Sequence, residues 1–293
     1  MIIAMLKGGI GNQMFQYAAA FALANKHQTP LKLDINYLLD KSKRYFRHTH
    51  REYALDVFNI TAEIASPKEI SQFTIPRIGN KYFYHFKKRI LKNYNFFEES
   101  NVHSQQEFFN IPADAYLDGF WQNASYIQDI RDFLLEQFSF KEPLPEYCTD
   151  MFNKIKNSNS VCVVFRRGDY VSHPELDITQ LSYYHAAIDI FQNKKNNFIY
   201  FIFSDDIPWC KTNFVRWDVE LFFVDQKFTG PKAQYYLELM VACKYFIIPN
   251  STYPWWAAWL NDDQGKVVIA PKRWFKSQIV DINPIVPNDW ITL

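Results

Sequence analysis

VCVVFRRGDY, at residues 161–170, joins an unbroken apolar run to a pair of adjacent arginines. The apolar half shows no alternation, which is typical of a parallel strand whose two faces are both covered. Arg166 and Arg167 then stand at the strand's carboxyl end, outside which open α/β sheets bind ligands. Guanidinium groups fit phosphate oxygens and keep their charge at neutral pH. We therefore predict a phosphate site here; the alternative is a surface salt-bridge cluster in which Asp169 pairs with one arginine.

Apolar segments of strand length recur through the second half of the chain and alternate with helical patterns. The predicted strands cover residues 197–203, 219–224, 245–248 and 265–270, and the predicted helices cover 235–243 and 253–260. This alternation predicts a doubly wound parallel sheet. Polar residues end two of these strands and are candidate contacts to a ribose or a base: Ser204, Asp205, Asp206 and Asp225.

A second candidate anion site follows the strand predicted at 245–248. Asn250, Ser251 and Thr252 precede a helix that contains three tryptophans. A serine or threonine at this position caps a helix, and the N–H groups of the first turn attract anions. By itself the motif also fits an ordinary helix cap. Two such sites on neighbouring strand ends together predict a clamp for a diphosphate, and the tryptophans are predicted to be core.

The first half opens with a second β-loop-α-β pattern. Residues 1–6 and 31–34 predict strands, 14–26 predict a helix, and the turn 7–13 between them is rich in glycine. Glycine lets backbone approach a ligand closely, which makes four residues of this turn candidate ligand contacts: Gly9, Gly11, Asn12 and Gln13. The turn matches neither a dinucleotide fingerprint nor a P-loop. Polar and proline-containing segments predict a domain boundary between residues 150 and 151.

Composition excludes several classes of protein. The chain has 293 residues, 48% hydrophobic and 22% charged, with a net charge of +1, which argues against a disordered chain and against a nucleic-acid-binding protein. Its four cysteines form no close pair, so we expect reduced thiols rather than a disulfide framework or a zinc ribbon. No apolar run reaches the length of a membrane-spanning helix. We therefore expect a soluble, cytoplasmic protein.

Four motifs resemble the α-1,2-fucosyltransferase family, glycosyltransferase family 11. They are GGIGNQMFQYA at 8–18, FRRGDYVSHP at 165–174, FSDD at 203–206 and LMVACKYFIIPNSTYPWWAAWLN at 239–261. The resemblance implies an α/β fold of GT-B type, with two Rossmann-like domains facing a central cleft. Residues 1–150 would form the acceptor-side domain and residues 151–293 the donor-binding domain.

The same resemblance implies an inverting transfer that needs no metal ion and no cofactor. Fucose would pass from GDP-fucose to the 2-OH of a galactoside in a bacterial surface glycan, which can be lipid-linked. The chain also lacks the D-x-D triplet with which many sugar-nucleotide enzymes hold a metal ion. Two basic segments, 41–51 and 81–92, are the candidates for contact with the inner face of the membrane. The alternative is that both segments are ordinary solvated surface.

Residue roles follow from the motifs and from the charge that grows on a departing diphosphate. Arg166 is the first candidate for stabilising that charge, with Arg167 holding geometry. The candidate catalytic residues are Arg166, Arg167 and Asp169. The candidate donor contacts are Gly9, Gly11, Asn12, Gln13, Ser204, Asp205, Asp206, Asn250, Ser251 and Thr252. The acceptor-side candidates are His173, Glu175 and Trp121, and the general base is left open among Asp169, His173 and Glu175.

Two positions depart from the family pattern. Where the family has a histidine two residues before the first arginine, this chain has Val164, and Tyr236 replaces an acidic residue. In related fucosyltransferases these positions help to hold the guanosine. Neither replacement can accept from guanine N1–H and N2–H together. The alternatives are therefore guanine recognition by other groups, a different nucleotide sugar, or a carbohydrate-binding protein without catalysis.

Overall fold

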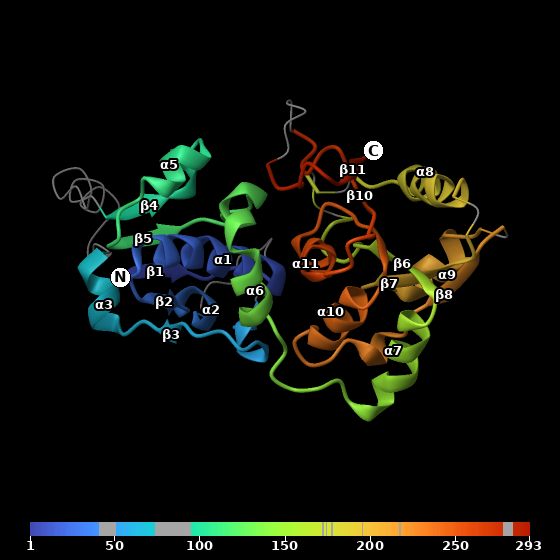
Figure 1. The fold of residues 1–293 in the computed structure, drawn as a ribbon, viewed down its shortest axis with the longest axis horizontal. Helices are drawn as coiled ribbons and strands as arrows, with labels where there is room; N and C mark the ends of the chain where they lie inside the picture. Colours follow the sequence, from blue (N-terminus) through green and yellow to red (C-terminus); the bar gives the residue numbers. More distant parts are fainter. Residues whose placement is uncertain are drawn as a thin grey trace. The chain divides into compact units, whose positions relative to one another are not determined.

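The structure is a computed structural model that describes residues 1–40, 51–73, 95–171, 173, 175–176, 178–194, 196–216, 218–277 and 284–293. The chain divides into two compact units, unit 1 at Met1–Ser139 and unit 2 at Phe140–Leu293 (Figure 1). The boundary lies earlier than the position expected between residues 150 and 151. The physical reason is packing, because Tyr147 contacts the rings of Phe228 and Tyr235 in unit 2.

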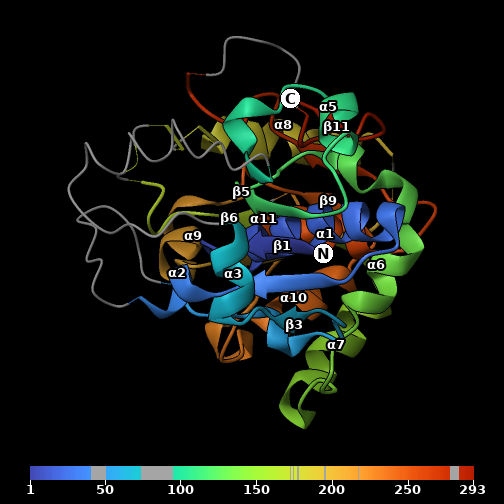
Figure 2. The same ribbon diagram turned by 90° about the vertical axis from the view of Figure 1, so that its left-hand side faces the viewer.

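Unit 1 contains a five-stranded, wholly parallel sheet in the order β3-β2-β1-β5-β4. The strands are β1 Ile2–Met5, β2 Leu31–Asp34, β3 Glu63–Ile64, β4 Phe96–Glu98 and β5 Ala115–Asp118. Figure 2 looks onto this unit and shows β3, β1 and β5 following one another across the sheet. The chain moves outward from β1 to β3, then crosses to β4 and returns to β5. The strand order therefore reverses between β1 and β5.

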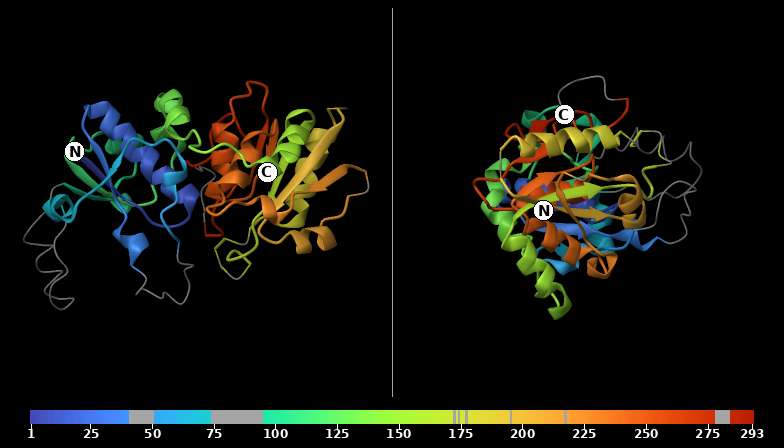
Figure 3. Two further views of the ribbon diagram at one scale, coloured as in Figure 1. Left: turned by 90° about the horizontal axis from the view of Figure 1, so that it is seen from below. Right: turned by 90° about the vertical axis from the view of Figure 1, so that its right-hand side faces the viewer.

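The glycine-rich segment of unit 1 is mostly helix, which corrects the turn expected over residues 7–13. Helix α1 covers Ile10–His27 and runs beside β1 (Figure 3). Gly8 has a φ of +79°, and a Cβ there would lie 2.5 Å from the Asn12 amide nitrogen. Glycine alone makes this reversal without strain, and the helix can therefore begin at once. Gly11, Asn12 and Gln13 belong to its first turn.

Unit 2 contains a six-stranded parallel sheet in the order β11-β10-β9-β6-β7-β8. The strands are β6 Asn159–Phe165, β7 Phe198–Ser204, β8 Glu220–Phe223, β9 Tyr245–Ile247, β10 Val268–Ala270 and β11 Ile291–Thr292. The five strands expected in this half are confirmed as β6 to β10, and β11 is an addition. Here the order reverses between β6 and β9.

Helices cover both faces of the second sheet, which explains why β6 shows no alternation. Its residues Val161, Val163 and Phe165 belong to one core cluster with side chains of α8, Leu181–Gln192. Successive strand residues face opposite sides, so Cys162 and Val164 face the other layer. There Tyr236 of α10, Gln234–Val241, meets Phe203 at 5.3 Å. Helix α11, Thr252–Leu260, packs against α10, and its three tryptophans are buried as predicted.

Shorter elements complete the described chain. The remaining helices are α2 Asn36–Leu39, α3 Pro67–Phe73, α5 Gln105–Phe109, α6 Arg131–Gln137, α7 Thr149–Lys156 and α9 Ile207–Asn213. Single 3₁₀ turns cover Leu55–Val57, Glu99–Asn101, Ala124–Tyr126, Gln128–Ile130, Glu146–Cys148 and Gln226–Phe228. All four cysteines are buried and unpaired with one another. Within the described ranges, no helix is long and apolar enough to span a membrane.

One half-buried carboxyl group makes the stability of unit 2 depend on pH. Burial raises the pKa of Glu238 on α10 to about 7, and its Oε2 atom has no hydrogen-bond partner among the described residues. Because the folded pKa exceeds the unfolded one, the native state binds more protons between these values. The free energy of unfolding therefore falls as pH rises from about 4.5 to 7.

We expect Glu238→Gln to remove this part of the pH dependence. At pH 8 the variant should be more stable than the wild type by about 1 kcal/mol, a figure reduced for the residue's partial exposure. At pH 4.5 the two should be alike. Urea unfolding at both pH values measures the difference, and Glu136→Gln, an exposed glutamate of α6, is the control. Equal stabilities of wild type and Glu238→Gln at pH 8 would contradict the expectation.

Candidate active site

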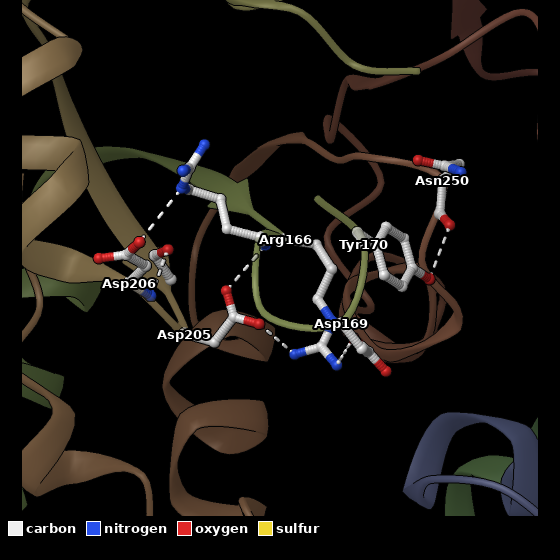
Figure 4. A network of polar contacts seen from close by, with 8 residues as sticks. Arg166, Asp169, Tyr170, Asp205, Asp206 and Asn250 are labelled. Carbon is white, nitrogen blue, oxygen red and sulfur yellow. Dashed lines mark hydrogen bonds and ion pairs between the residues drawn. The ribbon is translucent and has the colours of Figure 1, made fainter. Parts of the chain in front are cut away.

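The two predicted phosphate motifs meet where the strand order of unit 2 reverses. Arg166 directly follows β6, and Asn250 lies three residues beyond Ile247, the end of β9. The hydroxyl of Tyr170 donates to the Asn250 carbonyl at 3.2 Å and joins the two loops (Figure 4). Parallel sheets bind ligands at such switch points, outside the carboxyl ends of the strands. The arrangement therefore brings together the residues that the sequence predicted as a clamp.

Arg166 is held by carboxylates on two sides. Its Nη2 donates to Asp169 Oδ1 at 2.5 Å and its Nη1 donates to Asp205 Oδ2, while the guanidinium carbon lies 5.3 Å from the ring centre of Tyr170 (Figure 4). The side chain is 26% exposed. Within the described part of the chain, these hydrogen bonds use two of its five N–H groups. The group is thus fixed in direction and keeps donors for a ligand.

Arg167 is anchored by the loop that follows β7. Its backbone N–H donates to Asp205 Oδ1 at 2.8 Å, and its Nε donates to Asp206 Oδ2 at 3.2 Å. Its guanidinium carbon lies only 3.5 Å from the ring centre of Trp209, a cation–π contact. The salt-bridge alternative from the sequence therefore describes real contacts, and these contacts fix the direction of both arginines at the carboxyl edge of the sheet.

Ser204, Asp205 and Asp206 support the arginine loop in this structure. The Asp206 N–H donates to Ser204 Oγ at 2.9 Å, and Asp206 Oδ1 caps α9 by accepting from the Trp209 N–H at 3.1 Å. Trp209 and Tyr170 were not among the predicted site residues. Their positions in the sequence could have indicated them, because each lies within four residues of an arginine or a strand-end aspartate.

Gly168 fits against Asp205 so closely that a side chain there would disturb both arginines. A Cβ on Gly168 would lie 2.7 Å from Asp205 Oδ2, nearer than real Cβ contacts. We expect Gly168→Ala to displace this carboxylate and to lower kcat/KM about tenfold, because small misplacements of a catalytic group are costly. Steady-state kinetics measures the change. Gly265→Ala, remote from the strand-end loops, is the matched control, and equal kinetics of both variants would contradict the expectation.

The turn after β9 is built around a buried asparagine. The Asn250 amide donates to the carbonyl groups of Leu176 and Trp274 at 3.1 and 2.8 Å, while its Oδ1 is buried and without a partner among the described residues. Ser251 is the N-cap of α11 but makes no side-chain capping bond, contrary to the capping role predicted for it. Thr252 is the first helical residue. Asn250 therefore fixes the turn, and the helix start faces the switch point.

Two of the acceptor-side candidates, His173 and Glu175, lie together in unit 2, and the third, Trp121, belongs to unit 1. Glu175 Oε2 accepts from the Ser277 N–H at 2.9 Å, and hydrogen bonds from the Ser277 side chain and backbone lower the pKa of that carboxyl group. His173 Nδ1 accepts from the Glu175 N–H at 3.3 Å. Trp121 belongs to unit 1 and is 1% exposed, packed 5.7 Å from the ring of Phe108. The ring of this acceptor-side candidate is therefore part of the core of unit 1 in this structure.

The glycine-rich candidates also lie in unit 1. Gln13 is fully buried, and its amide donates to the Gly8 and Glu52 carbonyls while its Oε1 accepts from the Ala54 N–H. Its bonds are those of a residue that organises the fold rather than one that contacts a ligand. Asn12 accepts from Gln122 at 3.0 Å. A Cβ at Gly9 would meet nothing within 4 Å, so the backbone there is open on that side.

The two departures from the family pattern are both core residues. Val164 is 6% exposed, and its carbonyl accepts from the Tyr184 hydroxyl at 3.0 Å. Tyr236 is 5% exposed, and its hydroxyl donates to the Val224 carbonyl at 2.8 Å. The one proton of this hydroxyl group is therefore used in a hydrogen bond within the protein. In the ranges that the structure describes, no group of three or more His, Cys, Asp or Glu residues is placed to hold a metal ion.

Comparison with known proteins covers the whole chain. The model of the family described as "Glycosyl transferase family 11" matches residues 1–293. An α-1,2-colitosyltransferase from Escherichia coli is 34% identical over 100% of this chain and 98% of its own length. The E. coli O-antigen biosynthesis glycosyltransferase WbnK is 32% identical over 98% of this chain and 99% of its own length. The galactoside α-(1,2)-fucosyltransferase 1 of Bos taurus is 24% identical over 87% of this chain and 64% of its own length.

A solved structure shows the same architecture. The structure of an Arabidopsis thaliana FUT1 mutant in complex with GDP matches with a TM-score of 0.55 at 10% identity, over 92% of this chain and 70% of that one. A likeness at such low identity concerns the fold alone. Together with the two parallel α/β sheets, it confirms the fold class expected from the sequence, GT-B type with two Rossmann-like domains.

Proposed function

The chain belongs to glycosyl transferase family 11, and from that membership we propose that it transfers L-fucose from GDP-fucose to the 2-OH of a galactoside in a bacterial surface glycan. The transfer inverts the anomeric carbon and needs no metal ion. The observation that carries the proposal is that the Arg166 loop and the Asn250–Thr252 turn meet at the β6/β9 switch point, where Tyr170 joins them. Unit 2 then binds the donor, and unit 1 supplies the acceptor side.

The proposed reaction is a direct displacement at the anomeric carbon. The acceptor hydroxyl forms the new C–O bond and passes its proton to water, while the bond between the sugar and the diphosphate breaks on the opposite face. Negative charge grows on the departing diphosphate, and Arg166 stabilises it with the N–H groups that Asp169 and Asp205 leave unused. One such contact contributes about 2–4 kcal/mol in the transition state. The amides at the start of α11 take other phosphate oxygens.

Asp169, Asp205 and Asp206 act as positioning residues in this account. Each carboxylate contacts an arginine of the loop, and none is more than half exposed. Their charges prevent two adjacent guanidinium groups from repelling each other in the empty site. When a diphosphate binds, it adds the negative charge that completes the pairing. In this proposal Arg166 stabilises the leaving group, Arg167 maintains the geometry of the loop, and the aspartates orient the two arginines.

A second candidate donor is GDP-colitose. The observation that favours it is the 34% identity to an α-1,2-colitosyltransferase over the whole chain. Colitose is L-fucose without its 3-OH, so both donors place the same diphosphate beside Arg166. Because Val164 and Tyr236 offer the guanine edge no pair of acceptors, guanine would be held by backbone groups, or another nucleotide sugar would replace it.

A donor panel tests the proposal. The enzyme is incubated with a β-galactoside and, in turn, GDP-fucose, GDP-colitose, UDP-galactose and dTDP-rhamnose, with and without EDTA. We expect transfer from a GDP-linked deoxyhexose, equal in rate with the chelator. Transfer from the UDP or dTDP sugar alone would replace the proposed donor, and loss of activity with EDTA would overturn metal independence.

We further propose that the enzyme acts in the cytoplasm on a lipid-linked glycan at the inner face of the membrane. The support for this proposal is that a relative of 32% identity is described as an O-antigen biosynthesis glycosyltransferase. The basic segment 81–92, and residues 41–50 of the segment 41–51, lie outside the described residues. Sedimentation with vesicles that contain anionic lipid tests this membrane contact. It is measured with and without about 0.5 M salt, which screens the attraction between basic residues and lipid charges.

A further inference from the structure

Unit 1 has a switch point of its own, and a hollow lies at it. The strand order reverses between β1 and β5, and the residues just beyond those strands line a space of about 260 Å³ together with residues from the end of β4. The lining residues are Lys7, Glu98, Glu99, Ser100, Asp118, Gly119 and Phe120. Ligand sites for drug-sized molecules usually measure about 300–1,000 Å³. This hollow is therefore of a size for one small ring.

Its walls combine an aromatic face with hydrogen-bonding groups of both kinds. Phe120 is 39% exposed, and the Lys7 ammonium lies 5.0 Å from its ring centre. Lys7 Nζ also donates to Asp118 Oδ1 at 2.8 Å, and Glu99 Oε2 accepts from the Phe120 N–H at 2.6 Å. Lys7 provides donors only and the carboxylates provide acceptors only. A ligand with several hydroxyl groups can satisfy both.

The loop that presents Phe120 is held rigidly. The Gly119 carbonyl accepts from the buried Gln16 amide at 3.1 Å. A Cβ on Gly119 would collide with the Glu99 side chain and lie 3.0 Å from Trp121 Cε2. Trp121 itself adopts a φ of +54°, which is uncommon for a large side chain. This conformation buries Trp121 and leaves its neighbour Phe120 at the surface.

We propose that this hollow binds the acceptor sugar as a neutral pyranose ring, an inference that rests on the proposed function. The apolar C–H face of the ring lies on Phe120, and its hydroxyl groups donate to Asp118 and Glu99 and accept from Lys7. Three carboxylates face a single ammonium group among the lining residues, so the hollow repels a uronic acid or another anionic sugar. Phe120 and Lys7 determine which acceptor is used.

The test compares Phe120→Ala and Lys7→Met with the wild type, using methyl β-D-galactopyranoside and the matching galacturonoside. Phe133→Ala, which removes another exposed phenylalanine of unit 1, is the matched control. Acceptor KM is measured in the transfer assay, and binding is measured without donor by saturation-transfer NMR. We expect both hollow variants to raise the acceptor KM at least about tenfold and to lose the NMR signal, with the GDP dissociation constant unchanged. The galacturonoside should bind to none of them.

Each further outcome decides between the two proposals. Unchanged acceptor KM and NMR signal in both hollow variants would overturn the assignment of the hollow while leaving the proposed function intact. Binding that depends on Phe120, with no transfer from any GDP-sugar, would overturn the proposed function and keep the hollow as a sugar site. A galacturonoside signal as strong as that of the galactoside would overturn the preference for neutral sugars.

Discussion

Arg166→Ala should lower kcat/KM by about 10²–10³-fold, because it removes the charge that we propose stabilises the departing diphosphate. The donor KM and the GDP dissociation constant should both rise, since in the proposed mechanism the same group contacts the ground-state diphosphate. Arg166→Lys should fall between wild type and alanine, because lysine keeps the charge but loses the planar fork. Steady-state kinetics and GDP calorimetry measure these effects. Unchanged GDP affinity together with unchanged turnover would remove Arg166 from the donor site.

The chain offers a matched control for this substitution. Arg216 also donates to two carboxylates, Asp189 and Asp218, and lies in unit 2 outside the switch point. Arg216→Ala therefore removes a comparable pair of ion contacts without touching the proposed clamp. We expect its kcat/KM to match the wild type. A loss in Arg216→Ala as large as that in Arg166→Ala would show that both substitutions act through the fold.

Asp205→Ala should lower kcat about 10–100-fold while GDP affinity stays the same or increases. The carboxylate receives both the Arg166 guanidinium and the Arg167 backbone N–H, so its loss leaves the arginines misplaced. It also removes a negative charge that opposes diphosphate binding. A residue with a merely structural role would not separate turnover from affinity in this way.

Asp205→Asn tests the same assignment from the other side. Its side-chain oxygen can still accept from the Arg167 N–H at the position of Oδ1, while the charge facing Arg166 is lost. We expect it to recover part of the kcat lost in the alanine variant. Melting temperatures of both variants should stay close to the wild type. An asparagine variant no better than alanine would assign the effect to charge alone.

The sequence predicted unit 2 better than unit 1, for a physical reason. Strands buried on both faces must be continuously apolar, so β6 and β7 are visible in the residues themselves. The short edge strands β3 and β11 have two residues each and carry no such signal. The start of α1 was missed because Gly8 and Gly9 predict a loop until their backbone angles are known.

The candidate site shows the same division. The arginines and the asparagine turn were predicted because strand ends collect ligand contacts. The partnership of Asp205 with Arg166 could not be predicted, since it joins residues 39 positions apart in the loops after two different strands. The sequence offered Trp121 as an acceptor-side candidate, but it could not show that the Trp121 ring is core while the neighbouring Phe120 ring is exposed. The backbone angle that accompanies this burial, a positive φ at Trp121, is not visible in the sequence.

The most direct test of the account is the structure of the product. The wild-type enzyme is given GDP-fucose and methyl β-D-galactopyranoside, and the isolated disaccharide is examined by two-dimensional NMR. Inversion at a β-linked donor predicts an α-fucosyl residue, and the family predicts its attachment to O2 of galactose. A β-linked product, or attachment to another hydroxyl group, would contradict the proposed reaction.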